Sequence, residues 1–444
     1  LDAARTLAGS AQAGGADPPG LAVGRRVGAT WIVTGAFQRL GELVRITAEF
    51  LDVATGTVLR TVKLDGRLDA IFDLQDRIVF ELSQGLNLAL DASAISEIER
   101  AETQSVEAYE AFSRGMMNLR MGTRDALDRA IALFERAVVR DPGYAAAWMG
   151  LGSALDLKGE FLSLHELSAR AIDALRRAVA LDPGLALAHS RLGSAYLNLQ
   201  RYEDALRAVQ EAVRLDPTLA PARAMLGRIH WFGLGQFADG IRELEVAASL
   251  NVEGGYSFLQ LSLLYALTGD FHKAEVAARR AIDLQERYVS GKEGLQIVGA
   301  HLRLGYALYR QGRYDEAVRE YERELSFVSS GDHALRDRTA IEAHQKLSAA
   351  HWRRGDREAA DREFDRARVG FVARLASGAD DGATKYYVAA MYALRGDVEP
   401  ARRYLGEALA QLPGLNRARA RVDPDIDPVR DDPQIAALLA APAA

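Results

Sequence analysis

The feature that most constrains this chain is a recurring spacing of small residues from about residue 105 onward. Gly193, Ala205 and Ala212 lie twelve and then seven positions apart. The same two steps recur at Ser262–Ala274–Ala281, Ser348–Ala360–Ala367 and Ala389–Ala401–Ala408. Two helices approach closely only where small side chains face each other, and a glycine inside a helix costs about 1 kcal/mol relative to alanine. The spacing therefore predicts repeated pairs of antiparallel helices in close contact.

Turns and prolines fall where such pairs should begin and end. Gly269, Gly312 and Gly396 lie in short polar turns between the two helices of a pair, and Pro183 and Pro217 end the second helix, because proline cannot continue one. This arrangement, with a period of about 34 residues, resembles the tetratricopeptide repeat. The resemblance implies a mostly α-helical protein, an α-solenoid in which helix pairs form a right-handed superhelix. We count eight units within residues 105–415, centred on 108–141, 145–184, 186–219, 220–252, 255–288, 298–331, 341–374 and 382–415.

Some units depart from the pattern. Gly305 and Ala317 keep the first step, but Glu324 stands where a small residue is expected. Linkers near residues 289–297 and 332–340 are longer than usual, and we expect them to bend the solenoid. Residues 416–444 follow the last unit, and we expect them to cap its apolar face, which a solenoid requires for solubility.

The first hundred residues follow a different period. Residues 31–37, 44–51 and 57–64 read as strands, joined by turns at Leu40-Gly41-Glu42 and Ala54-Thr55-Gly56. Asp69 then precedes a stretch with apolar residues at helical spacing, for which it is a suitable N-cap.

The motifs Gly28-Ala-Thr-Trp-Ile-Val-Thr-Gly35, Val44-Arg-Ile-Thr-Ala, Leu51-Asp-Val-Ala-Thr-Gly56 and Ile71-Phe-Asp-Leu-Gln-Asp-Arg-Ile78 resemble the N-terminal domain of TolB and the related CsgG and FlgO-like domains of bacteria. The resemblance implies an interaction or accessory role for residues 1–90, a small α/β domain with a three-stranded antiparallel element and no evident opening strand. A purely structural cap on the repeats is the alternative. Residues 91–104 would be the linker.

Composition excludes several classes of site. The formal net charge of -6 arises from 55 basic and 61 acidic residues that are interleaved, so we expect no nucleic acid partner for this portion. With no cysteine, the chain has no disulfide, thiolate metal site or cysteine nucleophile. No apolar run approaches the roughly 18 residues of a membrane-spanning helix, so we expect no direct membrane insertion.

The common catalytic motifs are missing from the sequence. The chain has no phosphate-binding loop, no HExxH and no GxSxG sequence. His344 and His351 share a helical face, but their positions within the repeat favour packing over metal binding. We therefore predict a non-enzymatic protein with no catalytic, cofactor-binding or metal residues.

The predicted binding site is a groove on the concave side of the solenoid. The stripe of residues that lines this side in the resembling family is rich in aromatic residues and arginine, which dominate binding energy at interfaces. Its members are Asn198, Arg228, Trp231, Phe232, Tyr256, Leu263, Tyr306, Tyr309, Arg310, Trp352, Arg353 and Tyr386. We expect an apolar or amphipathic peptide segment of a protein partner here, with Arg228, Arg310 and Arg353 available for a carboxylate. Alternatively, several of the aromatic residues pack against neighbouring repeats.

Two functions remain open on this reading. The first is a scaffold for protein–protein interactions. The second is the sensory or regulatory C-terminal portion of a larger bacterial signalling protein, with a cyclase, a kinase or a winged-helix regulator upstream. The chain starts at Leu1, and we expect it to be part of something longer. An extracytoplasmic location is slightly preferred to the cytoplasm, and the oligomeric state stays undetermined.

Overall fold

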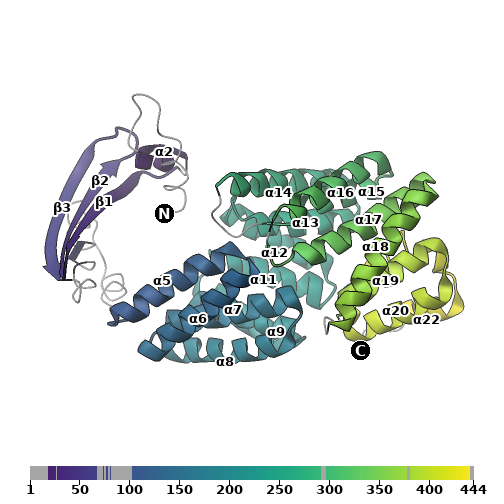
Figure 1. Ribbon diagram of the computed structural model, residues 1–444, viewed down its shortest axis with the longest axis horizontal. Helices are drawn as coiled ribbons and strands as arrows, with labels where there is room; N and C mark the ends of the chain where they lie inside the picture. Colours follow the sequence, from purple (N-terminus) through teal and green to yellow (C-terminus); the bar gives the residue numbers. More distant parts are fainter. Residues whose placement is uncertain are drawn as a thin grey trace. The chain divides into compact units, whose positions relative to one another are not determined.

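The computed structural model divides the chain into two compact units (Figure 1). One holds residues 1–110 and 139–144, and the other holds residues 111–138 and 145–444. The residues that the structure describes are 19–26, 28–67, 74, 77, 78, 81, 103–291, 297–331, 333–377 and 381–440.

The first unit contains a three-stranded antiparallel sheet. The helix α2 (Pro19–Arg26) precedes the strands β1 (Trp31–Leu40), β2 (Leu43–Asp52) and β3 (Val58–Arg67), which pair in the order β1-β2-β3. Alternation along β2 and β3 buries Ala48, Phe50, Val62 and Leu64 on one face, together with Leu74.

The predicted three-stranded element is confirmed, although each strand extends beyond its predicted end. β1 and β2 stay paired up to Leu40 and Leu43, next to the turn. The apolar alternation did not mark residues 38–40 because they are exposed on both faces of the sheet. Of the helix predicted after Asp69, only residues 74, 77, 78 and 81 are described, and Asp69 itself lies outside the described residues, as does nearly all of the predicted linker.

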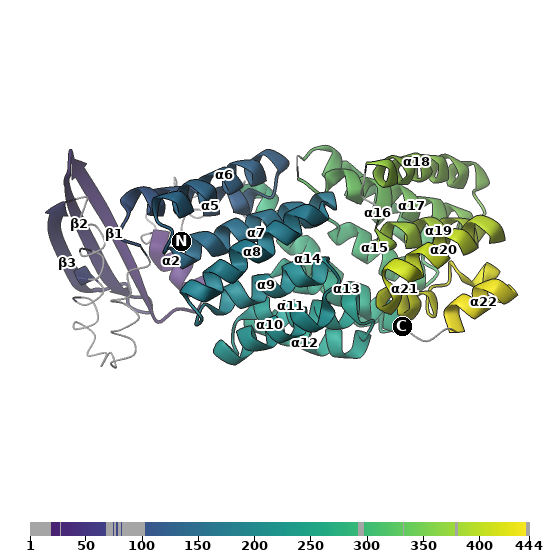
Figure 2. The ribbon, with the colours of Figure 1, turned by 90° about the horizontal axis from the view of Figure 1, so that it is seen from below.

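From α5 onward the chain is built from paired helices, as Figures 1 and 2 show in two views, and only the ends of α5 and α6 extend into the first unit. The helices are α5 (Val106–Met121), α6 (Arg124–Arg140), α7 (Ala145–Leu162), α8 (His165–Leu181), α9 (Ala186–Asn198), α10 (Tyr202–Leu215), α11 (Ala220–Arg228), the π-helical turn η2 (Ile229–Gly233), α12 (Phe237–Leu250), α13 (Gly255–Thr268), α14 (Phe271–Gly291), α15 (Ala300–Arg310), α16 (Tyr314–Ser329), α17 (Arg336–Arg354), α18 (Arg357–Ala376), α19 (Gly382–Arg395), α20 (Val398–Gln411), α21 (Pro413–Ala420), the 3-10 turn η3 (Asp427–Val429) and α22 (Pro433–Ala440). The predicted α-solenoid architecture is confirmed. Among the described residues, none of the helices has both the length and the apolar character needed to cross a bilayer.

The step of twelve residues is a direct contact between the two helices of a pair. Ser262 Oγ donates a hydrogen bond of 2.9 Å to the backbone oxygen of Ala274, and Ser348 does the same to Ala360 at 2.9 Å. At Gly193, an added Cβ would lie 2.2 Å from Val209 Cγ2. The small residues are therefore needed because the facing helix leaves no room for a larger side chain.

Glu324, the exception to the small-residue pattern, has a different role. Its buried carboxylate accepts hydrogen bonds from the backbone N–H groups of Gly299, at 2.7 Å, and His301, at 3.0 Å. These amides lie at the start of α15, where a negative charge complements the helix dipole. Glu324 thus stabilises the helix that follows the linker.

The second of the two predicted long linkers is wrong in its bounds, because α17 already begins at Arg336. Residues 336–340 lack the apolar periodicity of a helix, and for this reason the sequence did not predict the first turn of α17. Thr339 is buried, and Arg338 pairs with Glu342 at 3.1 Å. These contacts extend the helix into the predicted linker. For the other linker, α14 runs to Gly291, and residues 292–296 lie outside the described residues.

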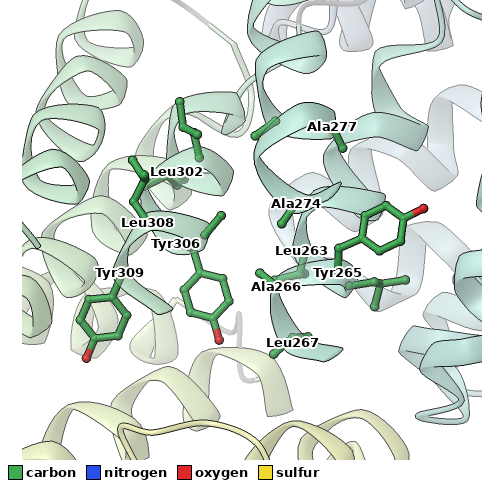
Figure 3. Packing of buried hydrophobic residues seen from close by; sticks show 14 of the residues in the cluster. Leu263, Tyr265, Ala266, Leu267, Ala274, Ala277, Leu302, Tyr306, Leu308 and Tyr309 are labelled. Atoms are coloured by element: carbon green, nitrogen blue, oxygen red, sulfur yellow. The ribbon is translucent and has the colours of Figure 1, made fainter. Parts of the chain in front are cut away.

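The largest core cluster joins several consecutive helix pairs. It includes Leu264 of α13, Ala274 of α14, Leu304 of α15, Tyr321 of α16 and Leu347 of α17. Figure 3 shows the part of this cluster contributed by α13, α14 and α15. Because each pair packs on its neighbours, the core is continuous along the solenoid.

The helical unit also contains contacts between helix pairs that are far apart in the sequence. The α5–α6 turn meets the segment before α17: Thr123 and His333 form an isolated β-bridge, and Ala334 N–H donates to Gly122 O at 3.0 Å. Beside this bridge, Arg374 Nη2 donates to Ser163 Oγ at 2.6 Å. The first two helix pairs are thereby held against α17 and α18.

A second closure involves α21 and the π-helical turn η2. A Cβ added to Gly414 would lie 2.6 Å from the backbone oxygen of Gly233, so the two backbones are nearly in contact. On the other side of α21, Asn416 Nδ2 donates to Gly382 O at 3.0 Å and to Ala408 O at 2.8 Å. α21 therefore connects the fourth helix pair to the last one.

Candidate protein-binding surface

The twelve predicted groove residues differ in their exposure to solvent. Half of them are buried, and these are Arg228, Trp231, Leu263, Tyr306, Tyr309 and Tyr386. Asn198, Phe232, Arg310, Trp352 and Arg353 are half-buried, and Tyr256 is 37% exposed. A partner could therefore reach some predicted positions directly, whereas others lie within the protein.

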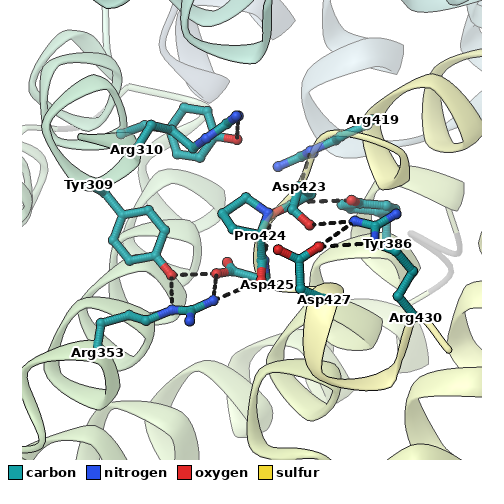
Figure 4. A network of polar contacts seen from close by, with 11 residues as sticks. Tyr309, Arg310, Arg353, Tyr386, Arg419, Asp423, Pro424, Asp425, Asp427 and Arg430 are labelled. Atoms are coloured by element: carbon teal, nitrogen blue, oxygen red, sulfur yellow. Dashed lines mark hydrogen bonds and ion pairs between the residues drawn. The ribbon is translucent and has the colours of Figure 1, made fainter. Parts of the chain in front are cut away.

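The chain's own C-terminal segment covers the predicted residues of the last repeats (Figure 4). The Tyr309 hydroxyl donates to the Asp425 carboxylate, and Arg353 Nη2 donates to the backbone oxygen of Pro424 at 2.7 Å. Arg353 Nε also lies 3.3 Å from the Tyr309 hydroxyl. Burial and the neighbouring Asp423 raise the pKa of Asp425 to about 6.

Tyr386 is covered by the same segment. Its hydroxyl donates to Asp423 Oδ2 at 2.9 Å, and the Arg419 guanidinium lies 4.6 Å from the centre of its ring. Arg430 fixes the turn of the segment by donating to Asp427 Oδ1 at 2.7 Å and to Asp423 O at 3.2 Å. Burial, followed by the charge of Asp423, raises the pKa of Tyr386 well above its ordinary value.

Four of the predicted residues come together in what we call the Arg228 surface: Asn198, Arg228, Phe232 and Tyr256. Arg228 Nη2 lies 3.4 Å from Asn198 Oδ1, and its guanidinium lies 5.6 Å from the centre of the Phe232 ring. Tyr256 is close enough to Arg228 for its charge to act on the hydroxyl, but burial dominates and raises the pKa of Tyr256 to about 12, while the residue as a whole is 37% exposed.

Two carboxylates of α7 support this surface, and the sequence analysis missed both. Glu160 accepts two hydrogen bonds from Arg228, at 2.7 and 3.0 Å, and Asp156 accepts from Asn198 at 2.9 Å and from Ser194 at 2.7 Å. Burial raises the pKa of Asp156 to about 6. Burial alone would raise the pKa of Glu160 as well, but the charge of Arg228 outweighs it and lowers that pKa. The available signal was an acidic residue, Asp156, inside the apolar run 151–157.

The remaining predicted residues do not join the Arg228 surface. Leu263, Trp231 and Tyr306 belong to the core. The guanidinium groups of Arg357 and Arg395 lie over the ring of Trp352, 3.5 and 4.9 Å from its centre.

Family comparisons agree with the helix pairs. Models described as tetratricopeptide repeat match residues 118–162, 186–219, 256–288 and 298–327, each of which contains a turn between two helices in the structure. The chain contains tetratricopeptide repeats.

Among curated proteins, the putative adenylate cyclase 3 of Rhizobium meliloti (strain 1021) is 27% identical over 129 residues, which make up 29% of this chain and 22% of that protein. The chain therefore matches about a fifth of that relative's length.

Several solved structures have a similar arrangement of helices, and one of them is described as a tetratricopeptide protein. The thermophilic protein TTC0263 from Thermus thermophilus shares 24% identity, over 41% of this chain and 98% of that chain, with a TM-score of 0.35. The APC/C hetero-tetramer Cut9–Hcn1 shares 17%, over 80% and 58%, with a TM-score of 0.46. MamA from Desulfovibrio magneticus RS-1 shares 20%, over 42% and 97%, with a TM-score of 0.29.

Two histidines of the repeats are each paired with a glutamate of the next helix. His344 Nδ1 lies 2.6 Å from Glu363, and His301 Nδ1 lies 2.8 Å from Glu320, nineteen residues further along in both cases. This recurrence is typical of a contact that belongs to the repeat itself. Within the described ranges, no group of three or more histidine, cysteine or acidic residues is arranged to hold a metal ion.

Proposed function

We propose that this chain is a non-enzymatic scaffold that binds an apolar or amphipathic segment of a partner protein on the Arg228 surface. The observation that carries the proposal is that four of the predicted groove residues lie together in the third to fifth repeats, with Asn198, the half-buried Phe232 and the 37% exposed Tyr256 around Arg228. Partly accessible aromatic residues next to a desolvated arginine have the composition of interface hot spots.

The contacts of Arg228, Arg310 and Arg353 indicate which of them could bind a carboxylate of the partner. Arg228 already has a two-point ion pair with Glu160, and Arg353 is covered by Pro424. Arg310 donates to the Tyr306 hydroxyl at 3.3 Å, and among the described residues no carboxylate lies within ion-pair distance of it. We therefore assign apolar side chains of the partner to Tyr256 and Phe232. Arg310 lies outside the Arg228 surface, so we assign to it only a carboxylate on a part of the partner that extends beyond this surface.

Site-specific photo-crosslinking tests the proposal. A benzophenone amino acid at Tyr256 should capture the partner in the native host, whereas the same group at Val276, an exposed position of α14, should not. Tyr256→Ala should then weaken binding of the captured partner about tenfold or more. Equal capture at both positions would contradict the assignment. Trp231 and Tyr306 are unsuitable for this test, because their burial makes any substitution destabilising.

A second function, the regulatory portion of a larger signalling protein, is favoured by the partial match to the putative adenylate cyclase 3. The proposed TolB-like nature of the N-terminal domain, supported by the order of its strands and turns, fits this reading as well. The sequence upstream of Leu1 in the source gene tests it. A catalytic or DNA-binding domain there would support the regulator, and a signal or lipoprotein sequence would contradict it. Incubation of the purified chain with ATP should give no cyclic AMP.

A further inference from the structure

The outer edge of β1 is an unusual feature of the sheet. Among the described residues, no strand pairs with this edge, because β1 lies at the end of the order β1-β2-β3. The strand is ten residues long, and Arg39 is its only charged residue. Its apolar side chains are accessible, including Val33 at 55% and Phe37 at 74%. A long apolar edge of this kind favours pairing with another strand.

The backbone groups available on this edge follow from the pairing with β2. Val53 N–H donates to Thr30 O at 3.0 Å, so the carbonyl of Thr30 points toward β2. Because these groups alternate along a strand, the even-numbered residues of β1 point theirs toward β2. The odd-numbered residues from Trp31 to Arg39 therefore point their N–H and C=O groups outward.

In one antiparallel register, the β1 strands of two copies of the chain present complementary side chains to each other. If two β1 strands run antiparallel about a two-fold axis at Gly35, Val33 lies opposite Phe37 of the second copy, and Trp31 lies opposite Arg39. Residues with outward backbone groups then face each other, and their side chains share one face. The resulting contacts are an apolar cross-strand pair and a cation–π pair, each formed twice.

The other edge of the sheet lacks this complementarity. β3 carries Arg60, Lys63, Asp65 and Arg67 among its ten residues, and its pairing with β2 is irregular at Phe50 and Leu51. Charges and irregular pairing are the means by which natural proteins protect an edge strand. The contrast makes β1 the edge that is open to a partner.

We propose that two copies of this chain pair antiparallel through β1, with Gly35 at the two-fold axis, into one continuous sheet. The interface forms an isologous dimer, since each copy contributes the same strand. It continues the apolar face of Ala48 and Phe50 across the two β1 strands.

A matched pair of double variants tests both the dimer and its register. The wild-type chain should sediment as a concentration-dependent dimer. V33K/F37K places lysines opposite lysines and should raise the dissociation constant at least about tenfold. V33K/F37E places lysine opposite glutamate twice and should restore the dimer, although it removes the same apolar groups. Equal behaviour of the two double variants would overturn the register.

Disulfide crosslinking gives a second measurement, for which the absence of cysteine from the chain is an advantage. When Val33→Cys and Phe37→Cys proteins are mixed and oxidised, a covalent heterodimer should form, because paired residues are within disulfide reach. Neither protein alone should crosslink, since each cysteine is offset from its own copy. A wild-type chain that stays monomeric, crosslinking of the single proteins alone, or loss of the dimer on Leu59→Lys in β3 would overturn the proposal.

Discussion

Asp156 positions a neighbouring side chain of the Arg228 surface, and its buried charge lowers the stability of the folded chain. It lies on α7 with its carboxylate buried, accepting hydrogen bonds from Ser194 and Asn198. Asn198 in turn contacts Arg228. The carboxylate therefore orients the Arg228 surface from behind, although burial disfavours its charged form.

Asp156→Asn should stabilise the protein more at pH 8 than at pH 5. In the folded chain the pKa of Asp156 is raised from 3.8 to about 6. Below pH 3.8 the carboxyl is protonated in both the folded and the unfolded chain, and its contribution to the free energy of unfolding is fully present. As the pH rises from 3.8 through about 6, the folded chain loses this contribution, because the unfolded chain releases the proton first. The full loss is on the order of 2–3 kcal/mol. Asparagine does not ionise, and the Ser194 hydroxyl can reverse its role to accept.

Urea unfolding of both proteins at the two pH values measures this effect. Glu160→Gln is the matched comparison on the same helix, and it should destabilise at both pH values, because Arg228 holds the pKa of Glu160 below its ordinary value. A loss of stability on Asp156→Asn at both pH values would show that the charged form is the favourable one.

At the scale of elements, the segment after α21 belongs to the fold of the last repeats. Ile426 and Val429 are buried in the cluster formed by α19, α20 and α22, and the carboxylates of Asp423 and Asp425 face Tyr386 and Tyr309. Such deep burial indicates a permanent cap, and the tyrosines beneath it are structural residues of this chain.

Ile426→Ala should destabilise the last repeat by about 2–5 kcal/mol, because it leaves a cavity in a closed core. In a solenoid each repeat contacts mainly its neighbours, so the loss should stay local. Hydrogen exchange should accelerate in α19 and α20 and remain unchanged in α9 and α10. Val422→Ala, at an exposed position of the same segment, is the control and should have little effect. Uniform acceleration along all the repeats would mean that the unit unfolds as a whole.

At the scale of the whole helical unit, the closure between the first repeats and α17 distinguishes this solenoid from an open one. Ala334 is buried against Leu127 and Phe161, and the β-bridge of Thr123 with His333 lies beside it. Thr123 and His333 are more than two hundred positions apart in sequence. The closure limits how far the helix pairs can move relative to one another.

Ala334→Glu should open this closure, because it places a carboxylate among apolar side chains. Spin labels on Met121→Cys and Arg336→Cys, both exposed, measure the distance across it. The distance should lengthen and broaden while the helix content is retained. Arg124→Ala, which removes an exposed ion pair of 3.0 Å with Asp337, should leave the distance unchanged. An unaltered distance in the Ala334 variant would mean that other contacts hold the closure.

What the sequence by itself determined is the pairing of helices and the existence of the sheet. The contact at Gly193 depends on side-chain size at a fixed spacing, and strand alternation depends on which residues face the core. Both are local properties, because the residues that decide them are close in the sequence or recur with the repeat.

Only the tertiary structure decided which predicted groove residues a partner can reach. Tyr256, Tyr309 and Tyr386 all belong to the predicted groove stripe, yet Tyr256 is 37% exposed and the other two are covered by the C-terminal segment. That outcome depends on the path of residues distant in sequence and on small rotations that add up from repeat to repeat. No single repeat carries the information, so its sequence could not reveal it.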